Sequence, residues 1–517
     1  MPSRLLAAGL LALVAATWKL WTPQDVFPQV PLIRAACDWP GWFDWVCLAV
    51  LVASSLTLLV VGQRGWWSRG SCIVMALSLA GFFVLDQHRL QPWAWQFFLL
   101  AVLLSLADDT TARRGWRWLV IGIYFWSAVS KLDYTFCHEQ GPALLGGLKQ
   151  AMGLRGMPNR WTEALDVCGS LGIALGELSV AVLLAWPRAR WLGLWTATIM
   201  HLALLAALGP FGLNHSLGVL LWNVFFIVQN WLLFQEAAAS HRPSGETVVV
   251  QVCTWLRDLV TWPTSRPNRL ALGVIVAAMA WPVLEPFGYC DHWLAWGVYS
   301  ARFDLFEVSL RIETNGSVRP VSVPPHLIIG HFGANGRFDL AGWSLNELTA
   351  PIYPQNRFHV GVWLAVLNRG DPELTNAWLY LWGPRHRWTA RTAHARGLVR
   401  RDEIEAVADG FFWNAHPRLV TFAVKPKNPS PSPPKTGGRG DKKPRPPMSD
   451  TRSNALTKLG TLSSALHSAI YSNREPIPNR SLDDALPIPR HEPVPRTTRC
   501  VAGLSRELRP RNARRPV

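Results

Sequence analysis

Three ionisable residues lie within long apolar runs of this sequence, where charged side chains are costly. Glu177 falls in the middle of one run, His201 in the middle of the next, and Lys131 at the end of an earlier one, just before Asp133. A lysine in a partly desolvated pocket can lose its proton and act as a base near neutral pH. With His201 shuttling protons and Glu177 balancing charge, this set could support proton transfer at a membrane face.

Each of these residues also has a purely structural interpretation. Glu177 could stay protonated or bond a neighbouring helix, His201 could serve packing alone, and Lys131 could extend its ammonium to the membrane interface. Other polar side chains in or beside the runs could extend a hydrogen-bonded interior: Gln96, His215, Asn223 and Gln229.

The composition indicates a membrane protein. Half of the 517 residues are hydrophobic and 16% are charged, against roughly 25% in soluble domains. The net charge of +17 is concentrated at the end of the chain, because residues 425–517 hold 19 Lys and Arg against 7 Asp and Glu. The hydrophobic and charged fractions exclude a soluble cytosolic enzyme. Because the basic residues are concentrated at the end of the chain, the net charge does not indicate a nucleic-acid-binding domain in the rest of it.

Nine apolar stretches are candidates for membrane-crossing helices, which need about 20 mainly apolar residues. They are 5–17, 45–61, 72–85, 92–107, 118–129, 167–186, 191–208, 217–234 and 270–284. Eleven basic residues fall in alternate connections and seven in the others, which favours a cytoplasmic N-terminus. The first stretch could instead be a cleaved signal peptide.

The region after the last apolar stretch has a soluble pattern. Phe303 to Ile312 alternate apolar and polar residues, with a phase slip at Phe306 that suggests a β-bulge, and Asn315-Gly316 is a hairpin signal. A short helix is expected over 403–408, between Asp402 and Gly410. We therefore expect three regions: a transmembrane bundle (1–288), a small extracytoplasmic α+β domain (289–424), and a disordered Pro/Arg-rich tail (425–517).

The eight cysteines are scattered, without a C-x-x-C pair. A metal ribbon or dithiol centre is therefore not expected, and no metal site is predicted. Any disulfide would have to join distant external positions such as Cys37, Cys137 and Cys290.

The segment from Tyr124-Phe125 to Lys131-Leu132-Asp133 resembles the "Y-F-x-x-x-x-x-K-L-D" pattern of the HTTM family, which contains vitamin K-dependent γ-carboxylase and bacterial relatives. Glu177, His201 and the turn Gly209-Pro210-Phe211-Gly212 follow in similar order, so the likeness covers residues 116–234. Short "F-x-x-A-x-x-K-L" segments of the DoxX and MauE families are also similar.

The resemblance implies a bacterial inner-membrane protein that works with a quinone at its outer face. Lys131 would correspond to the base that deprotonates the reduced quinone, with His201 and Glu177 as further catalytic candidates. The residues expected to bind the quinone are Tyr124, Trp126, Asp133, His215 and Asn223.

Two other functions fit the same sequence. The chain could be a non-catalytic scaffold or maturation factor for an exported protein partner, with polar residues that only hold helices together. A transporter is less supported, because no paired Gly/Pro-interrupted spans or internal repeats are evident. Membrane lipids are the expected surroundings in every case, and no nucleic-acid partner is expected.

Overall fold

A computed structural model describes residues 2–62, 65–154, 162–239, 262–300, 302, 304–314, 317–320, 338–369, 374, 377–391 and 396–418. Within these residues, six helices are long and apolar enough to cross a membrane. They are Trp42–Val61, Gly65–Leu85, Ala164–Ala185, Pro187–Leu208, Leu217–Glu236 and Arg266–Phe287. The chain is therefore a mostly helical, polytopic membrane protein.

All nine apolar stretches expected from the sequence are helical. They are α1 (Pro2–Ala16), α3 (Trp42–Val61), α4 (Gly65–Leu85), α5 (Pro92–Leu106), α6 (Asp109–Lys131), α8 (Thr162–Ala185), α9 (Arg190–Leu208), α10 (Leu217–Ala239) and α12 (Arg266–Ala280). Helices α1 and α5 have 15 residues each, or about 22 Å, which is shorter than the roughly 30 Å hydrocarbon core. Helix α6 has 23 residues, but Arg113, Arg114 and Arg117 occupy its first half. Nine crossings therefore stay a prediction, whereas six are supported.

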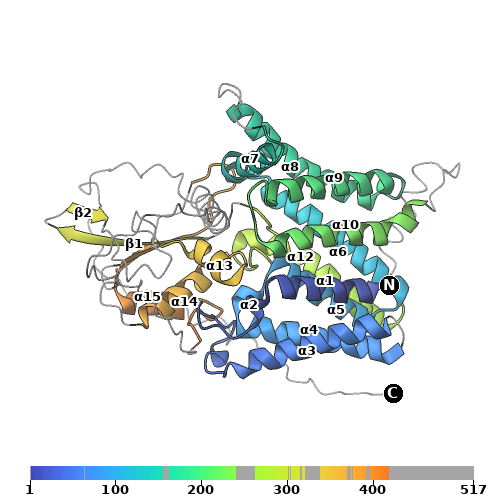
Figure 1. Ribbon diagram of the computed structural model, residues 1–517, viewed down its shortest axis with the longest axis horizontal. Coiled ribbons are helices and arrows are strands. Elements are labelled where there is room, and N and C mark those ends of the chain that lie inside the picture. Colours follow the sequence, from blue (N-terminus) through green and yellow to red (C-terminus); the bar gives the residue numbers. More distant parts are fainter. Residues whose placement is uncertain are drawn as a thin grey trace, which may run out of the picture. The chain divides into compact units, whose positions relative to one another are not determined.

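The long helices run alongside one another, as Figure 1 shows. Helices α6, α8, α9 and α10 form a closed group, in which α6 contacts α8 and α10, and α9 contacts α8 and α10. Helices α3, α4 and α5 pack in sequence, and α12 lies against α5 and α6. Helix α1 contacts α3, α5 and α10 and buries Leu6, Leu10 and Leu13 in the core of the bundle.

Helix α7 (Gly141–Ala151) is an element that the sequence did not predict. Three of its eleven residues are glycines, which are poor helix formers. It packs against α8 and α9, and a Cβ atom at Gly147 would lie 2.6 Å from the carbonyl oxygen of Ala207. Glycine at this position thus permits the close approach of α7 to α9.

Short helical turns connect these helices. They are α2 (Trp18–Trp21), η1 (Arg34–Ala36), η2 (Gln87–Arg89), the π-helical turn η3 (Phe136–Gln140), η4 (Pro187–Ala189) and η5 (Trp281–Phe287).

The expected β structure is present as a four-stranded antiparallel sheet. Its strands are β1 (Leu305–Thr314), β2 (Ser317–Pro320), β3 (Ala377–Trp382) and β4 (Arg396–Leu398), in the order β2-β1-β3-β4. Thr314 pairs with Ser317, so two residues join β1 to β2, as the hairpin signal predicted.

The predicted bulge at Phe306 is wrong. The register of β1 with β3 is continuous, from Leu305 opposite Trp382 to Leu310 opposite Ala377. The apparent phase slip arises because both faces of β1 are covered: Leu305, Val308 and Ser309 are all buried. Apolar residues therefore need not alternate along this strand.

Three helices accompany the sheet: α13 (Leu340–Leu348), α14 (Asn356–Leu367) and α15 (Arg401–Asp409). Helix α15 is the expected short helix; it begins two residues earlier than predicted, and Gly410 caps its C-terminus. We call residues 289–418 the α+β segment. The predicted disordered tail, 425–517, lies outside the described residues.

Six cysteines lie in the described part of the chain and all have free thiols, including Cys37, Cys137 and Cys290. The disulfide considered among those three positions is therefore not formed in this structure.

Candidate functional site

Helix α6 places three polar side chains on one face. Its first turn is capped by Asp108, whose carboxylate accepts a hydrogen bond from the amide of Thr111. Tyr124, Ser127 and Lys131 follow at spacings of three and four residues, so they share the side of the helix that is buried in the bundle. Helices α8, α9 and α10 supply the partners of this face.

Lys131 and Glu177 form a buried ion pair, which we call the lysine pair. Lys131 Nζ lies 2.9 Å from Glu177 Oε2 and donates to Ser127 Oγ at 2.6 Å. The two side chains are 2% and 7% exposed. Lys131 therefore does not reach solvent, which excludes the interfacial interpretation considered for it, and the structure brings together two of the three residues expected to be catalytic.

The third, His201, belongs to a separate hydrogen-bonded group deeper along α6, which we call the tyrosine chain. The Asn223 amide nitrogen donates to the carbonyl oxygen of Val219, so Asn223 Oδ1 faces His201 Nδ1 at 2.8 Å and accepts its hydrogen. His201 Nε2 is then an acceptor, and the Tyr124 hydroxyl donates to it at 2.6 Å. Asn230 Nδ2 donates to the same hydroxyl oxygen. Tyr124 is thus polarised by a neutral imidazole held in one tautomer.

The expected polar interior extends further. Gln229 Oε1 accepts hydrogen bonds from Gln96 Nε2 and Trp116 Nε1, each at 3.0 Å. Trp222 Nε1 donates to Gln96 Oε1 at 2.8 Å. These four residues join α5, α6 and α10, so they connect helices.

The remaining predicted site residues have other contacts. Trp126 donates to the carbonyl oxygen of Met279 on α12. Asp133 accepts from the amide of Phe136 and so begins the turn after α6; burial raises the pKa of its carboxyl group. The ring of His215 packs edge-to-face against Tyr299. Trp126 therefore joins α6 to α12, Asp133 stabilises the turn that follows α6, and His215 contacts the α+β segment through Tyr299.

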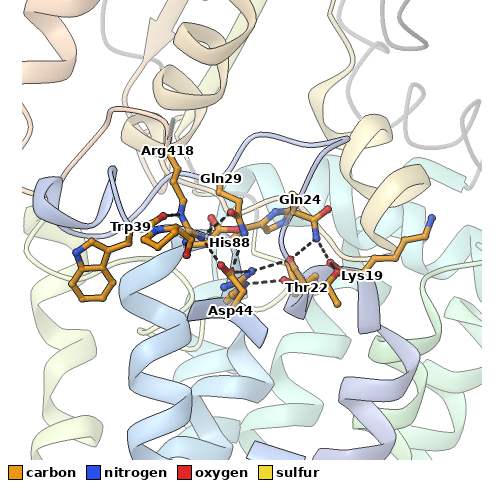
Figure 2. A network of polar contacts seen from close by, with 12 residues as sticks. Lys19, Thr22, Gln24, Gln29, Trp39, Asp44, His88 and Arg418 are labelled. Atoms are coloured by element: carbon orange, nitrogen blue, oxygen red, sulfur yellow. Dashed lines mark hydrogen bonds and ion pairs between the residues drawn. The ribbon is translucent and has the colours of Figure 1, made fainter. Parts of the chain in front are cut away.

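A second polar centre was missed by sequence reasoning (Figure 2). Asp44 accepts from two arginines: Arg89 NH2 lies 2.5 Å from Oδ1 and Arg418 NH1 lies 2.6 Å from Oδ2. Arg418 NH1 also donates to Gln29 Oε1 at 3.0 Å. The three charged side chains are 0% exposed. We call Asp44, Arg89, Arg418 and Gln29 the arginine clasp.

The arginine clasp continues into the connection between α4 and α5, residues 86–91, all of which are buried. Gln87 donates to the carbonyl oxygens of Pro31 and Asn414 and accepts from Arg357 Nε at 2.7 Å. His88 Nε2 donates to the carbonyl oxygen of Pro351 at 2.8 Å. This short loop therefore contacts both the bundle and the α+β segment.

Burial controls the titration of this loop. It raises the pKa of Asp86 to about 6, although Arg89 and two amide hydrogen bonds act in the opposite direction. It lowers the pKa of His88 to about 4. His88 is therefore neutral at physiological pH, whereas Asp86 is close to its titration range.

Sequence signals for this centre were weak. Arg89 is one of the seven basic residues in the second set of connections, and only its neighbours mark it: five of the six residues in 86–91 are polar and lie between two apolar stretches. Asp44 stands immediately before one expected apolar stretch. Nothing local marks Arg418, because its partners are more than 370 residues away in the chain.

Within the described residues, no group of three or more His, Cys, Asp or Glu side chains could hold a metal ion. No family model, curated protein or solved structure matches the chain.

Proposed function

We propose that this polytopic membrane protein transfers protons to and from a lipid-soluble substrate, with Lys131 as the base. The observation that carries the proposal is the lysine pair itself: an ammonium and a carboxylate 2.9 Å apart, both almost fully buried among helices. Buried pairs of this kind are costly to build and are frequent at proton-transfer sites. This cost favours a chemical role.

The proposed step is an acid–base reaction. Lys131 first gives a proton to the Glu177 carboxylate 2.9 Å away, which leaves a neutral amine beside a neutral carboxylic acid. A substrate hydroxyl group then gives its proton to this amine, leaving a substrate oxyanion beside the new ammonium. Ser127 Oγ fixes the Nζ position from the same helix turn. The Tyr124 hydroxyl, oriented by His201, is a second group that can exchange a proton.

We infer from the resemblance to the HTTM, DoxX and MauE families that the substrate is a quinone in its reduced form, met at the outer membrane face. A reduced quinone carries hydroxyl groups on an aromatic ring, so it is a lipid-soluble molecule that can give a proton to Lys131. The lipid tail would stay in the membrane while the head group meets Lys131.

The first test is mass spectrometry of the detergent-purified protein under conditions that retain lipids. We expect a quinone with the wild-type protein, its loss in Lys131→Met, and its retention in Lys149→Met. Lys149 is a suitable control because its ion pair with Asp166 is partly exposed and lies on α7 and α8. Equal retention in Lys131→Met, or no quinone in any of the three proteins, would overturn the quinone proposal.

Deprotonation has its own test. A naphthohydroquinone added without oxygen should show the absorbance of its oxyanion at lower pH when bound to the wild-type protein than when free. Lys131→Met should abolish this difference, and Lys149→Met should preserve it. A difference that persists in Lys131→Met would remove Lys131 from the role of base.

The alternative is a non-catalytic scaffold for an exported protein partner. It is favoured by the arginine clasp, which fixes the α+β segment to the bundle through fully buried charges. A scaffold would keep its cellular role in a folded double variant Lys131→Met/Glu177→Gln, whereas the proton-transfer function would be lost.

A further inference from the structure

The last described residues of the chain, which form neither helix nor strand, are hydrogen-bonded to residues 29–32. The amide of Asn414 donates to the carbonyl oxygen of Leu32 at 3.1 Å, and the amide of Arg418 donates to that of Gln29 at 2.8 Å. The Asn414 side chain adds a bond to the carbonyl oxygen of Pro31 at 2.9 Å. We call residues 411–418 the strap.

Arg418 is the charged group that fastens the strap. Besides Asp44 and Gln29, its guanidinium donates to the carbonyl oxygens of Trp39 and Pro40, each at 2.8 Å. Figure 2 shows the side chain reaching down from the α+β segment into this group of acceptors. All of these partners belong to residues 29–44, so one side chain joins the two parts of the chain.

The two arginines of the arginine clasp are not equivalent. Arg89 also donates to the carbonyl oxygens of Leu20 and Thr22, so all its bonds lie within the bundle. If Arg418 withdraws, Asp44 keeps Arg89 and a 3.3 Å hydrogen bond from Gln29. Withdrawal therefore leaves no buried carboxylate unpaired, which is the usual reason that a buried ion pair cannot open.

We propose that residues 411–418 form a releasable strap, latched by Arg418, that fixes the α+β segment to the bundle. The closed state is the one in this structure. In the open state, the bond from Gln87 to Asn414 is lost with the strap. The α+β segment stays attached through the bonds of Arg357 to Gln87 and of Pro351 to His88, and through the amide of Tyr134, which donates to the carbonyl oxygen of Arg387. Local opening of this kind needs less free energy than unfolding of the bundle.

The chain contains a natural probe of the strap. Cys37 is 9% exposed, and its Sγ lies 3.5 Å from Asn414 Nδ2 and 3.6 Å from the carbonyl oxygen of His416. The strap therefore covers this thiol when closed. Cys168 is exposed, so its labelling rate reports how reactive the reagent is. Cys72 is fully buried in α4, so its labelling reports opening of the bundle.

The experiment measures the rate of N-ethylmaleimide labelling at each cysteine by mass spectrometry of the full-length protein in detergent. In Arg418→Met we expect labelling of Cys37 to accelerate by about tenfold, because several charge-assisted hydrogen bonds are lost. Labelling of Cys168 and Cys72 should not change. Arg418→Lys keeps the charge but not the forked geometry, and it should give an intermediate rate.

Arg401→Met is the matched control. Arg401 lies in the same segment, but it is 55% exposed and pairs with Glu405 within α15. We expect wild-type labelling of Cys37 in this variant. The proposal is overturned if Arg418→Met labels Cys37 at the wild-type rate, or if Cys72 becomes reactive together with Cys37, since that would mean that the bundle unfolds. Neither outcome depends on the function of Lys131.

Discussion

Asp86 is a buried carboxyl group at the end of α4, where its Oδ1 accepts hydrogen bonds from the amides of Val30 and His88. Its pKa is raised from 3.8 to about 6 by burial. The folded state thus binds the Asp86 proton more tightly than the unfolded state. This contribution to stability is fully present below pH 3.8 and is lost as the pH rises through about 6.

We therefore predict that Asp86→Asn stabilises the protein at pH 7.5. An amide oxygen can accept the same two hydrogen bonds and carries no charge to desolvate, so the gain should be about 1–3 kcal/mol. At pH 4 the variant and the wild-type protein should have similar thermal midpoints. A variant less stable than wild type at pH 7.5 would show instead that the ionised carboxylate is needed beside Arg89.

The lysine pair allows a second prediction at the scale of single residues. Lys131→Met or Glu177→Gln alone leaves one buried group without its charged partner, which should cost about 3–5 kcal/mol. The double variant removes both charges and should be less destabilised than the sum of the two single variants. Unfolding of the wild-type protein and the three variants in detergent measures this coupling, and simple additivity would contradict a direct interaction.

At the scale of elements, α7 depends on which of its two adjacent glycines faces a neighbour. A Cβ atom at Gly147 would lie 2.6 Å from a backbone oxygen of α9, which cannot move aside without shifting that helix. A Cβ atom at Gly146 would meet nothing within 4 Å. The same substitution should therefore have opposite effects at neighbouring positions.

We predict that Gly147→Ala destabilises the protein by about 1–3 kcal/mol through overpacking. Gly146→Ala should instead be neutral or stabilising by about 0.5–1 kcal/mol, because alanine is the better helix former. Thermal unfolding of the two variants in one detergent provides the comparison. Equal effects at both positions would contradict the packing of α7 against α9.

At the scale of the whole molecule, Gln87 connects parts of the chain that are far apart in sequence. Its side chain bonds Pro31, Asn414 and Arg357. Because the Gln87 side-chain amide forms hydrogen bonds with both the bundle and the α+β segment, we expect these two parts to unfold together in the wild-type protein.

We predict that Gln87→Ala separates these transitions. The α+β segment should then lose its protection against amide hydrogen exchange before the helices of the bundle do, as hydrogen exchange with mass spectrometry at increasing denaturant would record. Gln150→Ala, which removes one bond from Gln150 to the carbonyl oxygen of Gly212, should leave a single transition. Coincident transitions in Gln87→Ala would show that other contacts suffice for coupling.

Much of the fold follows from local pattern. All nine apolar stretches are helical, the β1–β2 hairpin forms at its turn signal, and α15 ends before Gly410 as expected. Asp402 is not the N-cap of α15, however, because Arg400 occupies that position. Helix α7 did not follow, because packing against α8 and α9 overrides the low helix propensity of its glycines. The prediction of a β-bulge was wrong because both faces of β1 are buried, and the sequence of a single strand does not show whether one face or both are buried.

The sequence by itself determined which residues are expensive to bury, and hence that Lys131, Glu177 and His201 would need partners. Only the tertiary structure decided how they are paired: Lys131 with Glu177, and His201 with Tyr124 and Asn223. The contacts of the arginine clasp were not predicted from the sequence and are seen only in the tertiary structure. The reason is physical: hydropathy and periodicity are properties of neighbouring residues, whereas an ion pair between Asp44 and Arg418 exists only after folding brings together residues 374 positions apart.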